Sequence, residues 1–205
     1  MKGSAMSTES MSKVGCSVLI SVFFICCFGS TAFSATIPKL AKPSSSYSTS
    51  NINLKFGGDW TTFAGQCTKY TTKPYLTWYH TGIDIKASKG SDVYAAESGV
   101  VKVSQDSGTK WKEWIAIEHK DSKGNKYTTN YWHLKNRKVN VGKNITRGSK
   151  IAEVADMGLN THLHFGLYNK AYENTANRGG LPQNNTCSGY PAYKDSFVNP
   201  VDYLP

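Results

Sequence analysis

Two of the five histidines in this 205-residue chain, His162 and His164, stand two residues apart. The surrounding run, Thr161 to Tyr168, is typical of a β-strand. Side chains two apart on a strand point to the same face, so both imidazoles face one side. Two imidazoles held side by side suit a metal site, with one as a ligand and the other as an acid or base. The alternative is a pair of exposed or hydrogen-bonded histidines.

A second polar pair, His80 and Asp84, lies upstream. Ile83 and Ile85 alternate with Asp84, so the carboxylate and the isoleucines lie on opposite faces of a strand. Gly82 stands between His80 and Asp84 and allows a bend that lets the two polar groups converge. The alternative for Asp84 is a surface carboxylate on an edge strand.

The remaining histidines lie in two alternating runs, residues 113–119 and 126–133, which flank a turn and predict a β-hairpin. On the first strand His119 shares the face of two isoleucines, and we expect it to be structural. On the second strand, alternation places His133 on the face that also carries Tyr127, Thr129 and Tyr131.

The rest of the chain favours β structure as well. It is rich in Gly, Tyr, Thr and Ser, and further short strands are indicated at 91–96, 99–104 and 150–154. No ten-residue helical period is present. The fold class is therefore mainly β, an antiparallel sheet with few or short helices. The length suits one domain with a proper core.

The N-terminus has the order of a secretory signal peptide, which we place at residues 1–35. Lys2 and Lys13 precede an apolar run, Val14 to Phe28, and a stretch of small residues follows it. The apolar run is short for a membrane span, so we expect export and no stable span after cleavage. The alternative is a retained N-terminal anchor. We expect 36–51 to be a flexible linker or pro-segment and 52–205 to be the folded domain.

Cysteines and charge fit an exported protein. Cys67 and Cys187 remain after leader removal and predict a disulfide, with two unrelated buried thiols as the alternative. The net charge of +10 attracts polyanions, and cell-wall polymers, lipid head groups and nucleic acid all fit this description. A generally basic and soluble surface explains the charge equally well.

Two common hydrolase motifs are missing: there is no His-Glu-x-x-His helix and no Gly-x-Ser-x-Gly elbow. The motifs that are present resemble those of the lysostaphin-type, or LytM-type, zinc metallopeptidases of peptidase family M23. They are His80-Thr-Gly-Ile-Asp84, Tyr131-Trp-His133-Leu and His162-Leu-His164-Phe. The likeness covers a motif core at residues 80–168 and the packed tail at 198–205. It implies the antiparallel fold of that family, with a substrate groove.

The resemblance implies a role for each polar residue. His80, Asp84 and His164 would be the ligands of one zinc ion per chain, which leaves a position open for water. His133 and His162 would be the catalytic pair. Because the motifs contain no glutamate, an imidazole would take the proton of the attacking water. The other imidazole would orient that water or stabilise the oxyanion, and the sequence leaves open which is the base.

The chain departs from the family pattern in three places. Gly166 stands where many members have a glutamate, the approach at 157–161 is short, and the loop insertion at 169–197 is long. We expect little effect from Gly166, because that position is not one of the chemical groups. The short approach and the long insertion affect the shape of the groove and therefore its peptide specificity. Four aromatic residues are candidates for lining it: Tyr75, Trp78, Tyr79 and Trp132.

The function that the resemblance implies is an exported, zinc-dependent endopeptidase that cleaves peptide bonds of bacterial peptidoglycan. We expect a periplasmic or secreted monomer that does not bind nucleic acid. One alternative is a non-catalytic domain of the same fold that binds the wall or activates another hydrolase. A second is an exported metallopeptidase that acts on protein.

Overall fold

The structure is a computed structural model, which describes residues 34–56, 80–173 and 196–205. The expected signal peptide and the two cysteines Cys67 and Cys187 lie outside these residues, so export and the disulfide stay predictions. Within the described ranges, no helix has the length and apolar character needed to cross a membrane.

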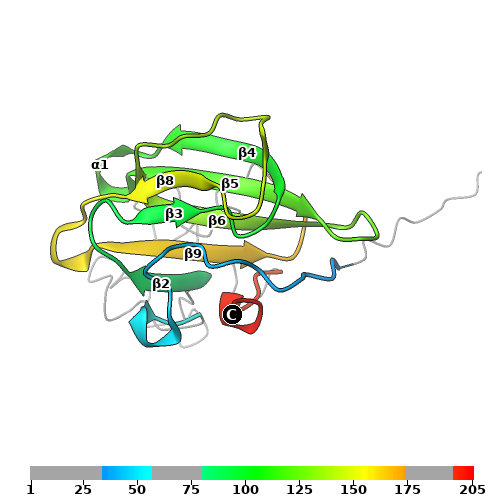
Figure 1. The fold of residues 1–205 in the computed structure, drawn as a ribbon, viewed down its shortest axis with the longest axis horizontal. Helices are drawn as coiled ribbons and strands as arrows, with labels where there is room; N and C mark the ends of the chain where they lie inside the picture. Colours follow the sequence, from blue (N-terminus) through cyan, green and yellow to red (C-terminus); the bar gives the residue numbers. More distant parts are fainter. Residues whose placement is uncertain (1–33, 57–79, 174–195) are drawn as a thin grey trace, which may run out of the picture. The chain divides into compact units, whose positions relative to one another are not determined.

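The described residues form a nine-stranded sheet in which every strand pairing is antiparallel (Figure 1). The main path runs β1-β2-β9-β6-β5-β4-β7, and β8 pairs with β3 and β6. The helices in these ranges are single turns, so the expected fold class is confirmed. The strands are β1 Ile52–Leu54, β2 Gly82–Lys86, β3 Asp92–Tyr94, β4 Gly99–Asp106, β5 Glu113–Lys120, β6 Lys126–Lys135, β7 Asn144–Ile145, β8 Lys150–Val154 and β9 His162–Tyr168. The helical turns are η1 Thr49–Asn51, α1 Gly108–Trp111, η3 Gly158–Asn160 and η5 Pro200–Asp202.

One face of the sheet carries the main hydrophobic core. Leu163, Phe165 and Leu167 alternate along β9 and are completely buried. Across β2 the same face is continued by Ile83 and Ile85, because β2 and β9 are paired in register. Burying apolar side chains of this size is the main favourable term in folding. This face therefore fixes which side chains of β2 and β9 point the other way.

The opposite face has a smaller apolar cluster at its centre. Trp114 and Trp132 stack with ring centroids 4.3 Å apart and an interplanar angle of 7°. Both are buried, together with Val103 and Ala116. The residues of this cluster come from neighbouring strands β4, β5 and β6. The polar residues of the candidate site share this face with the aromatic cluster.

Residues 36–51 differ from the sequence expectation. They were expected to form a flexible linker or pro-segment, but Leu40 and Tyr47 are buried in the main core. Backbone hydrogen bonds join Leu40 N to Tyr203 O and Ala41 N to Ala96 O, each 2.8 Å long. The prediction of a flexible linker is therefore wrong. A few apolar side chains are enough to order a Ser- and Pro-rich stretch when they pack into a core that other strands build.

The hairpin and the tail follow the sequence expectation. Strands β5 and β6 are antiparallel partners, and their turn is fastened by Asp121, which accepts hydrogen bonds from two backbone amides. At the far end of the chain Leu204 is buried. The ends of the expected insertion meet, because Asn169 N donates to Ser196 O at 2.7 Å. Residues 174–195 of that insertion lie outside the described ranges.

Candidate metal centre

Strands β2 and β9 bring Asp84 and His164 directly opposite each other. Gly82 makes this close approach possible. A Cβ atom at Gly82 would lie 2.4 Å from the carbonyl oxygen of Phe165 and 2.9 Å from Nε2 of His164. No side chain fits into that space, so glycine is required by packing against β9.

His80 completes a compact cluster with Asp84 and His164. Oδ1 of Asp84 lies 3.0 Å from His80 Nε2 and 3.0 Å from His164 Nδ1. The two imidazole nitrogens are 2.9 Å apart. All three residues are buried, and their candidate ligand atoms lie within 4.8 Å of one another. Two imidazole nitrogens and one carboxylate oxygen are a donor set that zinc accepts in catalytic sites.

The ring of His80 is oriented by a contact outside the cluster. Its Nδ1–H donates to the carbonyl of Lys55, 3.1 Å away. A proton is thereby placed on Nδ1, and Nε2 is the ring nitrogen that faces Asp84. Metal-binding histidines commonly have this second contact. Lys55 directly follows β1, so the residues that precede β2 help to build the site.

Burial and local charge set the protonation states. Burial alone raises the pKa of Asp84, but the charge of His80 and hydrogen bonds from both histidines hold that pKa well below its usual range. Burial lowers the pKa of His164 to about 4, against the hydrogen bond to Asp84, which raises it. At neutral pH the site therefore combines a carboxylate with a neutral imidazole, as metal binding requires.

His133 reaches this face through a break in the strand. Strict alternation places it on the same face as Tyr131, and that expectation is wrong. Glu113 pairs with Leu134, and the next residue, Trp114, pairs with Trp132. His133 is therefore the extra residue of a bulge. Its φ of 64° lies in the left-handed region. A bulge re-aims a side chain, and here the His133 ring comes to lie 4.5 Å, between centroids, from the ring of His162.

The two remaining imidazoles differ in exposure. His162 has a side-chain exposure of 16%, and its Nε2 lies 3.6 Å from Oδ2 of Asp84. Its Nδ1–H donates to the carbonyl of Asn160. His133 is buried, and burial, followed by the charges of His162 and His164, lowers its pKa to about 3. His133 is therefore neutral over the physiological range.

Sequence reasoning missed two neighbours of the site. Trp111 lies over His133, with ring centroids 6.1 Å apart, and no pattern pointed to it because it lies in the single turn α1. Asn130 is buried on the site face, between Thr128 and Trp132 along β6. Finding Asn130 requires the pairing of β6 with β9, because it stands opposite Gly166, two residues from His164. Of the aromatic candidates for the groove, Trp132 is buried, and Tyr75, Trp78 and Tyr79 lie outside the described residues.

His119 is structural, as expected. Its Nδ1–H donates to Ser98 O at 2.9 Å, and its Nε2 lies 2.8 Å from Oγ1 of Thr129. Thr129 is bonded in turn to the hydroxyl of Tyr131, which accepts from the backbone N–H of Ala96. Burial lowers the pKa of His119 to about 4. Both ring nitrogens are used inside the fold.

The described residues thus combine an antiparallel β fold with a buried cluster of two histidines and one aspartate, the donor set of a metal site. Residues 78–177 match the model of peptidase family M23. This match confirms the resemblance drawn from the sequence: that part of the chain is an M23 peptidase domain. The roles of the individual site residues rest on the geometry above.

Known proteins give further likenesses. The peptidoglycan DD-endopeptidase ShyC of Vibrio cholerae is 29% identical over 121 residues, which cover 58% of this chain and 26% of that protein. The match thus spans about a quarter of that relative's length. The structure of Csd3 from Helicobacter pylori aligns with a TM-score of 0.51 at 19% identity. The alignment covers 82% of this chain and 35% of Csd3, and it shows a shared fold.

The catalytic domain of the antimicrobial peptidase lysostaphin from Staphylococcus simulans also aligns. Its TM-score is 0.44 at 20% identity, covering 61% of this chain and 78% of that chain.

Proposed function

We propose that this protein is an exported, zinc-dependent endopeptidase that hydrolyses peptide bonds in bacterial peptidoglycan. The observation that carries the proposal is the buried cluster of His80, Asp84 and His164, with the rings of two further histidines beside it. The match to peptidase family M23 supports peptide-bond hydrolysis. The match to a relative named as a peptidoglycan endopeptidase supports the substrate.

His80, Asp84 and His164 would hold the zinc ion. When bound, zinc supplies a Lewis acid that polarises the scissile carbonyl and makes water a stronger acid. The donor set fits, because the carboxylate of Asp84 and the neutral imidazole of His164 are already in the required states, and Nε2 of His80 faces the carboxylate. With three protein ligands a position stays open for the reactants.

We assign proton transfer to His162. Its ring is the least buried imidazole of the site, and its Nδ1–H is engaged by Asn160, so Nε2 is the nitrogen that accepts a proton. The carboxylate of Asp84, 3.6 Å away, stabilises the imidazolium that forms. His162 would then return the proton to the leaving amine.

We assign an orienting role to His133. Its low pKa makes it a weak base, and its Nδ1 is buried without a partner among the described residues. The backbone of Trp111 forms a hydrogen bond with the ring. His133 would therefore orient the attacking water without keeping its proton.

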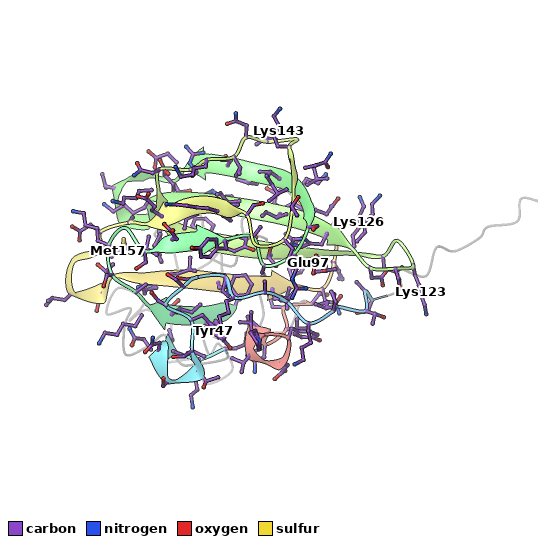
Figure 2. The ribbon with its side chains drawn as sticks, viewed as in Figure 1. Tyr47, Glu97, Lys123, Lys126, Lys143 and Met157 are labelled. Carbon is purple, nitrogen blue, oxygen red and sulfur yellow. The ribbon has the colours of Figure 1, made fainter. Side chains whose placement is uncertain are left out.

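The basic charge supports an anionic surface as the setting of the reaction. Figure 2 shows Lys123 at the turn between β5 and β6 and Lys143 at a different edge of the sheet, and both are exposed. The charge is thus distributed over the domain, which favours general attraction to anionic wall polymers. The fraction of protein that sediments with purified walls should then fall as the salt concentration is raised.

The decisive test is mass spectrometry of fragments released from purified peptidoglycan of known composition. The chain is incubated with zinc, with a chelator, and as the His162→Ala variant, and His119→Gln serves as the matched control. The proposal predicts release with zinc by the wild type and the control, and none in the other two arms. The new fragment ends identify the bond.

Absence of release by zinc-loaded wild type would overturn the proposal. Wall binding that persists without release would then favour the non-catalytic alternative. Cleavage of protein substrates in place of peptidoglycan would favour the alternative of an exported metallopeptidase that acts on protein.

A further inference from the structure

Gly166 leaves a space on the site face of the sheet. In the strand register it stands between Gly82 on β2 and Asn130 on β6. A Cβ atom at Gly166 would lie 3.6 Å from Cβ of Asn130 and 3.6 Å from Nε2 of His164. Asn130 and the outer nitrogen of His164 therefore border the same space, which no side chain of Gly166 fills.

The carbonyl oxygen of Thr81 also borders this space, 3.5 Å from the same Cβ position. The side-chain polar atoms of Asn130 and the outer nitrogen of His164 lack partners among the described residues. Oδ1 and Nδ2 of Asn130 and Nε2 of His164 are all buried without a hydrogen bond. Buried polar groups are nearly always paired, either directly or through an ordered water. The two side chains that supply these three atoms both border the space, so they offer unpaired donors and acceptors beside it.

The inference rests on the proposed metal centre. A metal-bound imidazole is neutral and carries its proton on the nitrogen that faces away from the metal. In His164 it is Nδ1 that faces Asp84 and His80. The proton must then be on Nε2, which is buried and needs an acceptor. The acceptor fixes the tautomer and the orientation of the ring.

We propose that Asn130 is a positioning residue for His164, whose Nε2–H is held by Oδ1 of Asn130 through one buried water in the space above Gly166. The two residues lie diagonally across the β6–β9 pair, because Asn130 is opposite Gly166 and His164 is two residues before Gly166. Side chains at diagonal positions are within reach of each other. The bridge would hold Nδ1 in the form that binds the metal.

Other polar side chains are less suitable. His80 and Asp84 contact the opposite nitrogen of His164. Thr128, the next residue of β6 on this face, donates its hydroxyl to the carbonyl of Lys170 at 3.1 Å. Thr128 is therefore a matched control: it is buried on the same strand and face but bonded elsewhere.

The test is the zinc dissociation constant of the full chain, measured by competition with a chromophoric chelator. Asn130→Ala should weaken zinc binding by about 10- to 100-fold. Asn130→Asp keeps an acceptor oxygen and should bind at least as tightly as the wild type. Thr128→Val should leave zinc binding unchanged. If Asn130→Ala does not fold, Asn130→Leu supplies the same deletion with a side chain of similar volume.

A second readout separates positioning from a loss of packing. In the zinc-loaded chain with ¹⁵N-labelled histidine, the Nε2–H of His164 should exchange slowly with solvent in the wild type and Asn130→Asp. It should exchange faster in Asn130→Ala. Equal zinc affinity and equal exchange in all of these variants would overturn the role of Asn130.

A His164→Ala variant shows whether a negative result concerns only the role of Asn130 or the metal centre as a whole. If wild type binds zinc and His164→Ala does not, the centre stands whatever Asn130 does. If the two bind zinc equally, the metal centre fails, and the role of Asn130 fails with it.

Discussion

His119 and His164 are both buried histidines on one sheet, but their rings are paired differently. Both nitrogens of His119 have partners within the fold. His164 has Nδ1 in the polar cluster and Nε2 without a partner among the described residues. Burial lowers the pKa of both to about 4. The lowered pKa therefore does not separate the structural histidine from the candidate ligand, but the hydrogen-bond partners do.

The same difference extends to the neighbours of these two rings. On the core face, His119 belongs to a closed chain of bonds that ends at Ala96. On the site face, His133 also has a buried nitrogen without a partner among the described residues. Unsatisfied buried groups cost stability, and those of His133 and His164 lie in the candidate site, so we infer that they are retained for function.

The largest expected effect is that of His164→Ala. Removing a ligand should abolish zinc binding and lower kcat/KM by about 1000-fold or more, because a Lewis acid contributes several kcal/mol to the transition state. Metal analysis after gel filtration and assays on peptidoglycan measure the two effects. His119→Gln should keep its zinc, and loss of zinc in that control would break the comparison.

The next effect is that of His133→Ala. Its kcat should fall by about 100- to 10,000-fold, because proton-transfer and orienting groups contribute this much. Zinc affinity should stay close to that of the wild type, because His133 is not in the ligand cluster. Kinetics and zinc competition on the same preparation separate the two. Equal loss of zinc and activity would place His133 among the ligands.

Acid should destabilise the fold through His119. Its pKa is about 4 in the fold and near 6.5 in the unfolded chain, so between these values the unfolded state binds more protons. Stability is therefore lost as pH falls from about 6.5 to about 4, by about 3 kcal/mol in all. Urea unfolding across this range, compared between wild type and His119→Gln, isolates the contribution. Parallel pH curves would show that His119 does not cause it.

The smallest effect is that of Thr129→Val. It keeps the shape of the side chain and breaks the chain between His119 and Tyr131. The free energy of unfolding should fall by about 1–3 kcal/mol, because buried polar groups lose their partner. Activity per folded molecule should not change. Reduced activity at full folding would connect the structural face to the site.

Much of the fold follows from local patterns. Alternation along β9 and β2 correctly predicts which side chains enter the core, because a buried face with period two fixes the register. It cannot predict residues 36–51, where Leu40 and Tyr47 are isolated apolar residues in a polar stretch. Their burial depends on a core built by distant strands.

The candidate site is predicted less evenly. Alternation places Asp84 on the face of the strand that Ile83 and Ile85 do not occupy. The resemblance then groups Asp84 with His80 and His164. The same rule gives the wrong face for His133, because the bulge and its positive φ interrupt the period. Asn130 needs the register between β6 and β9, which no local pattern contains.

The central claim is that the cluster of His80, Asp84 and His164 binds zinc. Zinc-edge X-ray absorption on the loaded chain tests it most directly. We predict a first shell of two imidazole nitrogens at about 2.0–2.1 Å and oxygen at about 2.0–2.2 Å. The imidazole signal should fall in His164→Ala and persist in His119→Gln. A sulfur shell at about 2.3 Å, or a spectrum unchanged in His164→Ala, would contradict the account.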